Sequence, residues 1–256
     1  METVMGKTKL LSGFMLKWIA IIGMVVDHFG SIIIDGVLSP YVVNGSIYFT
    51  ADMPYFIFHA FTIKNICGIF GDIAFPLFFF LVAEGFLKTR NRLKYGTRVG
   101  IFALISEIPY NLAHYQTIFE PKLQNVLVTL SIAIFTLILI SKIEEKYQDH
   151  KTVRWVYVIL STITGMGVAF LLRGEYVFLG VLAIVLFYLL RSNEYLRLCG
   201  LCPFLIVSPW VLLSLIPITM YNGQRGKGPK YFFYIFYPAH LLLFALIAQI
   251  LSNRII

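Results

Sequence analysis

Ionisable side chains interrupt the long apolar runs of this sequence. They are Asp27, His28, Glu84, Glu107 and His240, and the neutral polar residues Asn111 and Tyr237 accompany them. If these runs cross a bilayer, each charge at its centre costs about 2.5 to 3.5 kcal/mol on insertion scales, so each is a functional candidate. The plainer alternative is that they join helices through ion pairs or hydrogen bonds.

The helical rise of ~1.5 Å per residue orders these groups by depth. His28 follows Met15 by 13 residues, which places it roughly 20 Å from the inner face and in the outer third. Glu84 stands about 6 Å from that face, four residues before Lys88, and we expect it to pair with the basic 88–98 loop. Glu107 and His240 fall near the midplane. Such a column of polar groups fits a proton or substrate pathway, or a reaction chamber open to both faces.

The composition requires a membrane around these groups. Hydrophobic residues make up 59% of the chain and charged residues 13%, about half the ~25% of a soluble domain. The first apolar run, from Met15 to Ile34, is too long for a removable signal, whose apolar region has ~7–15 residues. We therefore predict one transmembrane domain over 1–256. The net charge of +8 fits contact with lipids of the cytoplasmic leaflet and gives no reason to expect nucleic acid.

Eight stretches are long enough to serve as membrane helices, which need ~20 residues or slightly fewer. They are 14–34, 73–87, 97–113, 124–141, 154–172, 176–190, 198–219 and 231–252. The predicted fold is an all-α, polytopic bundle of about eight transmembrane helices. The 176–190 stretch is short and is expected to be tilted or partly re-entrant.

Basic residues in alternate loops set the expected orientation, since short cytoplasmic loops are rich in Lys and Arg. The 88–98 and 142–154 loops are basic, whereas 35–72 and 114–123 are not. This pattern places the N-terminus in the cytoplasm and the protein in the cytoplasmic membrane. The 221–230 loop breaks the pattern, because it falls outside by parity yet carries three basic residues. Either one span is miscounted, with 53–70 as the candidate, or this loop folds back.

Ordered motifs over most of the chain carry a resemblance. They are LKWIA at 16–20, DHFG at 27–30, IAFPLF at 73–78, EGF at 84–86, TRN at 89–91, ALISEIP at 103–109, NL at 111–112, QNV at 124–126, EY at 175–176, YNG at 221–223, RG at 225–226, KYFFYIFYP at 230–238 and HL at 240–241. With these motifs the chain resembles the TraX family of membrane acetyltransferases, named for a pilin acetylase. The resemblance implies transfer of an acetyl group from acetyl-CoA to an amine, which includes the N-terminal amine of a secreted or pilin-like polypeptide.

The resemblance extends distantly to larger transmembrane acyltransferases that use a histidine in an early span, which makes His28 the catalytic candidate. Histidine suits a general base because its unperturbed pKa of ~6.5 lies near working pH, and it could instead accept the acetyl group itself. His240 and Glu107 are further catalytic candidates, although His240 could only satisfy backbone groups freed by Pro238. Tyr237 could donate to an oxyanion or belong to an interfacial aromatic belt.

Cationic groups are needed to hold the phosphates of coenzyme A. Arg90, Arg92 and Arg98 are candidates because arginine binds phosphate in bidentate fashion. Asn222 and Arg225 lie in a glycine-rich loop with the composition of an anion-binding nest, and Glu84 could position a basic group there. No metal is expected, because Cys199 and Cys202 have no second cysteine pair or histidine nearby.

Two other classes of protein remain open from the sequence. A proton-coupled transporter would use Glu84, Glu107 and His240 as a relay, although no internal repeat, common in transporters, is evident. A scaffold for pilus assembly or secretion would neither bind acetyl-CoA nor transport protons. Binding of acetyl-CoA separates the enzyme from both.

Overall fold

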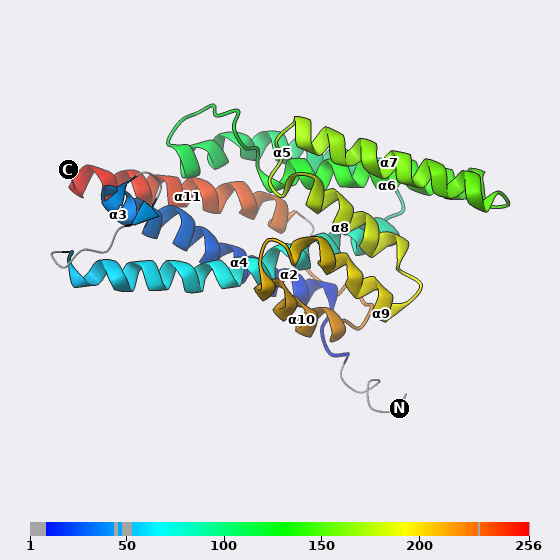
Figure 1. The fold of residues 1–256 in the computed structure, drawn as a ribbon, viewed down its shortest axis with the longest axis horizontal. Coiled ribbons are helices and arrows are strands. Elements are labelled where there is room, and N and C mark those ends of the chain that lie inside the picture. The colour runs from blue at the N-terminus through cyan, green and yellow to red at the C-terminus, as the bar shows by residue number, and fades with distance from the viewer. Residues whose placement is uncertain (1–8, 44–45, 48–52, 230, 256) are drawn as a thin grey trace.

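The computed structural model describes residues 9–43, 46–47, 53–229 and 231–255. Its long helices run broadly along one axis (Figure 1). They are α2 (Gly13–His28), α4 (Tyr55–Lys88), α5 (Arg92–Tyr115), α6 (Val126–Lys146), α7 (Lys151–Leu171) and α11 (Phe232–Ile255). The 13-residue helix α8 (Val177–Leu189) packs beside α6 and α7.

Short elements connect these helices at their ends. After α2 come the π-helix η1 (Phe29–Ile34), α3 (Asp35–Leu38), η2 (Ser39–Tyr41) and the antiparallel strands β1 (Val42–Val43) and β2 (Ser46–Ile47). After α8 come α9 (Glu194–Arg197), η3 (Leu198–Phe204), η4 (Pro209–Ser214) and α10 (Leu215–Thr219). The strands are two residues each, so the fold is all-α, as the sequence predicts.

Five helical segments of the described chain are long and apolar enough to cross a membrane. They are Gly13–Tyr41, Tyr55–Lys88, Val126–Lys146, Lys151–Leu171 and Phe232–Leu251. Helix α5 has 24 residues but contains several charges, which lower its hydropathy. The expectation of a multi-pass helical membrane protein is thereby confirmed.

The predicted list of eight spans needs two corrections. The 73–87 stretch is the second half of α4, a single helix of 34 residues that also contains 53–70 from Tyr55 onward. Lys64 does not interrupt this helix, because it forms an ion pair with Asp35. The 198–219 stretch is not a span: Pro203, Pro209 and Pro217 divide it into η3, η4 and α10, since proline cannot donate a helical hydrogen bond.

These corrections explain the basic 221–230 loop. Backbone hydrogen bonds run from Leu11 N to Met220 O (3.0 Å), from Asn222 N to Leu11 O (2.9 Å) and from Gly13 N to Gln224 O (2.8 Å). The loop therefore lies beside the start of α2. One span was miscounted, and it was 198–219 rather than 53–70. We call this end of the molecule, which also holds the end of α4 and the connection between α6 and α7, the basic end (Figure 1).

The core lies where α4 packs against α8 and η3. Phe79, Phe86, Phe187 and Phe204 are among its largest fully buried side chains. Gly200 lets η3 approach α8 closely, because a Cβ atom at this position would lie 2.5 Å from the Phe187 ring. The 198–219 segment, which was expected to be a span, thus packs against α8 at Gly200.

We predict that Gly200→Ala destabilises the protein by about 1–3 kcal/mol, because overpacking forces the Phe187 ring or the backbone to move. Thermal unfolding in detergent measures the effect. Gly167→Ala in α7 is the matched control, since no atom lies within 4 Å of a Cβ there, and alanine favours a helix over glycine by up to ~1 kcal/mol. Equal melting temperatures for the two variants would contradict this packing.

Candidate functional site

His28 is the last residue of α2, at the point where the chain changes into a π-helix. Short π-helical segments occur frequently at functional sites, since they re-aim the side chains around them. His28 is only 7% exposed. The expected catalytic residue therefore lies in the interior of the bundle and not against lipid.

His28 and His240 form a buried pair between α2 and α11. Nδ1 of His28 lies 2.7 Å from Nε2 of His240, and the two rings are nearly parallel, with an interplanar angle of 7°. Nδ1 of His240 lies 3.0 Å from the carbonyl oxygen of Phe236. His240 thus contacts both a backbone carbonyl one turn earlier on α11 and the ring of His28.

These contacts determine the tautomers of the neutral pair. A carbonyl oxygen can only accept, so Nδ1 of His240 donates to Phe236 and its Nε2 accepts. Nδ1 of His28 must then be the donor to His240, which leaves the lone pair of His28 on Nε2. No group among the described residues hydrogen-bonds this Nε2. The arrangement presents one imidazole nitrogen ready to take a proton.

His28 lines a cavity of about 40 Å³ between α2, α4, α6, α11 and the 172–176 loop. Its polar lining comes from Asp27, His28, Glu175 and Tyr237, and Phe75, Phe78, Phe79 and Tyr176 supply much of the remainder. A cavity needs about 10–15 Å³ of such volume to hold one water molecule, so this cavity admits small groups.

Tyr237 is buried, with 5% of its surface exposed, and its hydroxyl has no hydrogen-bond partner among the described residues. A buried unpaired hydroxyl costs free energy, so the Tyr237 hydroxyl is open to a further hydrogen-bond partner. Because its side chain is buried, Tyr237 is not part of a lipid-facing aromatic belt.

Glu175 also faces this cavity and was not among the predicted site residues, although the EY motif contains it. Its loop is held to the start of α6 by hydrogen bonds from Gln124 N to Arg173 O (2.8 Å) and from Glu175 N to Gln124 O (2.9 Å). Arg173, Tyr176 and Val177 have positive φ angles, which are uncommon for residues other than glycine and store strain at functional sites. Glu175 could not be identified from the sequence, because the backbone strain around it is visible only in the structure.

The charge of Glu175 is finely balanced. Burial and the negative charge of Asp27 raise the pKa of Glu175 to about 7, while the nearby backbone N–H of Val126 opposes this rise. Val126 is the first residue of α6, whose N-terminus favours negative charge. The cavity therefore joins two carboxyl groups, one imidazole, one hydroxyl and the start of a helix.

Glu107 supports this helix start and does not reach the cavity. Its carboxylate accepts hydrogen bonds from the side chain and the backbone N–H of Asn125. Asn125 in turn caps α6 by accepting from Leu127 N at 3.0 Å. Of the four predicted catalytic residues, the structure brings together His28, His240 and Tyr237, whereas Glu107 acts at a distance through Asn125.

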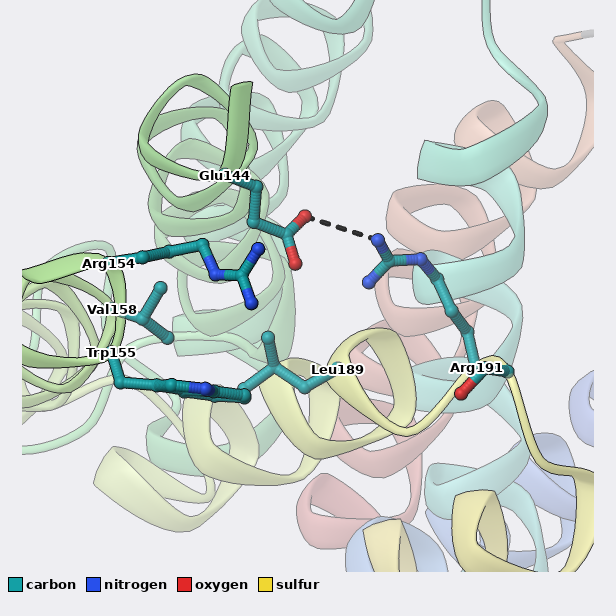
Figure 2. A pocket seen from close by; sticks show the side chains of 7 residues that line it. Glu144, Arg154, Trp155, Val158, Leu189 and Arg191 are labelled. Atoms are coloured by element: carbon teal, nitrogen blue, oxygen red, sulfur yellow. Dashed lines mark hydrogen bonds and ion pairs between the residues drawn. The ribbon is translucent and has the colours of Figure 1, made fainter. Parts of the chain in front are cut away.

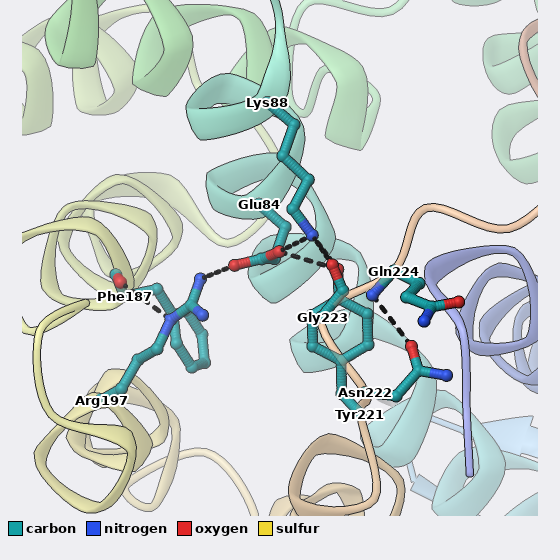
Figure 3. A network of polar contacts seen from close by, with 8 residues as sticks. All are labelled: Glu84, Lys88, Phe187, Arg197, Tyr221, Asn222, Gly223 and Gln224. Atoms are coloured by element: carbon teal, nitrogen blue, oxygen red, sulfur yellow. Dashed lines mark hydrogen bonds and ion pairs between the residues drawn. The ribbon is translucent and has the colours of Figure 1, made fainter. Parts of the chain in front are cut away.

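Glu84 is the centre of a separate polar network at the basic end (Figure 3). Its carboxylate forms ion pairs with Lys88 (2.7 Å) and Arg197 (2.6 Å) and accepts a hydrogen bond from the Tyr221 hydroxyl (2.8 Å). Burial, together with this carboxylate, raises the pKa of Tyr221. The expected partner in the 88–98 loop is Lys88, but Arg197 and Tyr221 come from segments that the sequence did not connect with Glu84.

Of the predicted phosphate-binding arginines, Arg98 and Arg225 lie near each other, whereas Arg90 and Arg92 lie elsewhere. The guanidinium of Arg98 lies 5.8 Å from the centre of the Tyr234 ring, and Arg225 lies within electrostatic range of Tyr234 and of Lys17. Arg90 is exposed, and Arg92 packs on the Phe86 ring at 4.8 Å, so neither belongs to this group. The side chain of Asn222 points to its own turn, where its Oδ1 accepts from Gln224 N at 2.9 Å.

Lys17, Arg98 and Arg225 thus gather from α2, α5 and the 220–229 loop around the start of α11. Lys17 lies over the Phe233 ring at 5.3 Å. None of the three forms an ion pair with a described carboxylate. We call them the cation cluster. Lys17 precedes His28 by 11 residues on α2, a rise of about 16 Å.

The chain belongs to the TraX family, because the family model described as "TraX protein" matches residues 12–248. A similar curated protein is the "Probable fimbrial assembly protein FimC, serogroup H1" of Dichelobacter nodosus. It is 26% identical over 253 residues, which cover 91% of this chain and 93% of that protein. No solved structure matches this chain.

We predict that Glu175→Gln changes how stability depends on pH. The folded-state pKa of about 7 lies above the ~4.3 of an unperturbed glutamate, so the wild-type protein loses stability as pH rises through this window. The variant lacks this loss, which we expect to be on the order of 2 kcal/mol. Melting temperatures in detergent at pH 5 and pH 7.5 measure it.

Glu145→Gln, which changes an exposed carboxylate on α6, is the matched control and retains the wild-type pH dependence. The assignment of Glu175 as a buried carboxyl fails if Glu175→Gln has the same difference between the two pH values as the wild type.

Proposed function

We propose that this protein is a membrane-embedded N-acetyltransferase that moves an acetyl group from acetyl-CoA to an amine. The observation that carries the proposal is the His28–His240 pair, which leaves Nε2 of His28 as a base on a cavity that also holds two carboxyl groups. Membership of the TraX family supports the same chemistry.

The cavity suits an amine better than an alcohol. An amine arrives largely as an ammonium ion at neutral pH, and Asp27 and Glu175 offer negative charge to attract it. No lysine or arginine lines this cavity. The amine must lose a proton before it can attack, and Nε2 of His28 is the group to receive it.

Transfer then follows in a single exchange of bonds. Once Nε2 of His28 has taken the first proton of the ammonium ion, the amine nitrogen forms a bond with the carbonyl carbon of the thioester and the carbon–sulfur bond breaks. The coenzyme A thiolate leaves and takes up the second amine proton, and His28 returns its proton to water. The hydroxyl of Tyr237 is the donor for the negative charge that develops on the carbonyl oxygen.

The cation cluster is the proposed site for the phosphates of acetyl-CoA. Three cations without ion-pair partners match a ligand with several negative charges. The rise of about 16 Å from Lys17 to His28 is a distance that the pantetheine arm can bridge. On this account Arg98 and Arg225 bind the donor, while Glu84, Arg90, Arg92 and Asn222 do not touch it.

The acceptor is proposed to be the N-terminal amine of a pilin-like polypeptide. The relative in Dichelobacter nodosus is named a probable fimbrial assembly protein, and the TraX name derives from pilin acetylation. The basic end would face the cytoplasm, so acetyl-CoA would enter from there in the cytoplasmic membrane. No metal is part of this mechanism.

A proton-coupled transporter has less support from the geometry. Glu84, Glu107 and His240 lie in separate networks, with Glu84 held by Lys88 and Arg197, and Glu107 held by Asn125. A relay needs groups that can exchange protons with one another in sequence.

We predict that His28→Ala lowers acetyl transfer to a peptide amine by about 10²–10⁴-fold, the usual contribution of a general base. His240→Ala has a smaller effect in the same direction, because it releases His28 without removing the base. Purified protein, radiolabelled acetyl-CoA and an N-terminally free peptide measure both. Arg92→Gln is the control with unchanged activity, and full activity in His28→Ala would overturn the mechanism.

We also predict that the double substitution Lys17→Gln and Arg225→Gln raises the KM for acetyl-CoA by about tenfold or more, since each lost phosphate contact removes ~1–3 kcal/mol. The turnover number changes little, because His28 stays in place. Arg90→Gln, an exposed arginine outside the cation cluster, keeps the wild-type KM. If coenzyme A binds the double variant as tightly as the wild type, the phosphates are held elsewhere.

A further inference from the structure

A second cavity, of about 200 Å³, lies at the basic end between α6, α7 and the segment that follows α8 (Figure 2). It is lined by Glu144, Arg154, Trp155, Val158, Leu189, Arg191 and Ser192. None of these residues belongs to the His28 cavity or to the cation cluster. The proposed binding of the acetyl donor and of the acceptor does not use this cavity.

Arg191, one of the two arginines of this cavity, has partners within the chain. Arg191 donates to the Glu144 carboxylate at 3.1 Å and to the Tyr188 carbonyl at 2.9 Å, and it stacks over the Tyr188 ring at 4.1 Å. Glu144 also accepts from the Tyr188 hydroxyl at 2.6 Å. The charges of Glu144 and Arg191 therefore compensate each other.

Arg154 is the other cation, and it has no ion pair with a described carboxylate. Its guanidinium extends into the cavity across from Arg191 (Figure 2). The cavity thus has a net positive charge and a planar donor group that matches a phosphate in geometry. Ser192 adds a hydroxyl on the same lining.

The surroundings of the cavity are those of a bilayer interface. Trp155 is 47% exposed, and Val156, Ile159 and Ile163 continue an exposed apolar face along α7. Tryptophan prefers the level of lipid headgroups, and such apolar faces accommodate acyl chains. A ligand held by Arg154 therefore has a place for its hydrocarbon chains directly alongside.

We propose that this cavity binds the headgroup phosphate of an anionic phospholipid, with Arg154 as its cation and Trp155 beside the glycerol backbone. Basic pockets between transmembrane helices on the basic side of a membrane recognise such headgroups. The proposal does not depend on acetyl transfer, because no residue of the proposed reaction lines this cavity.

Fluorescence quenching tests the proposal, since the chain has three tryptophans. The substitutions Trp18→Phe and Trp210→Phe leave Trp155 as the reporter. The protein is placed in phosphatidylcholine bilayers that contain an equal small fraction of brominated phosphatidylglycerol or brominated phosphatidylcholine. We expect phosphatidylglycerol to occupy the site about fivefold more strongly, which corresponds to ~1 kcal/mol for one basic group near an anionic lipid.

Substitution of the cation should abolish this preference. Arg154→Gln brings the ratio of the two lipids to about one, whereas Lys151→Gln, an exposed lysine one turn earlier that does not line the cavity, retains most of it. A second reporter with Trp210 alone shows no comparable preference. An unchanged melting temperature confirms that Arg154→Gln is folded.

Three outcomes would overturn the proposal. Equal quenching by both lipids means that the site does not recognise the headgroup. A preference that persists in Arg154→Gln means that another group provides it. Loss of the preference on addition of inorganic phosphate or coenzyme A means that the cavity takes phosphate from solution and not from lipid.

Discussion

The hydrogen bond between His28 and His240 joins the first and last long helices of the described chain, across a separation of 212 residues. In lipid, a buried polar group has no water to bond, so its partner must come from another helix. Helix α11 otherwise packs mainly against α5 and η1 and makes few contacts with α2. The pair therefore aligns two helices and, in doing so, selects which nitrogen of His28 remains basic.

The buried polar groups of this protein differ in whether they have partners within the chain. Glu84 is held by ion pairs with Lys88 and Arg197 and by a hydrogen bond from Tyr221, so it connects three segments at the basic end. The hydroxyl of Tyr237 has no such partner among the described residues. Because an unpaired buried group costs free energy, this hydroxyl and Nε2 of His28 are the groups that the proposed substrate would contact.

The same contrast applies to the cations. Lys88, Arg191 and Arg197 are held by carboxylates, whereas Lys17, Arg98, Arg225 and Arg154 are not. These four cations lie at the basic end but in two different places, three at the start of α11 and one between α6 and α7. The two proposed phosphate-bearing ligands, a soluble coenzyme and a membrane lipid, would account for this distribution.

The sequence by itself determined that the chain crosses a membrane as helices, because the shortage of charge and the apolar runs of about 20 residues leave no other fold. It also singled out His28, His240 and Tyr237, since polar groups inside such runs are costly. Only the tertiary structure decided which of them meet. The rise along a helix gives the depth of a residue but not the neighbour that it faces, so the His28–His240 pair, Glu175 and Lys17 could not be assigned. The apolar 198–219 segment likewise had the hydropathy of a span, and only the packing of its proline-divided turns against α4 and α8 showed that it does not cross.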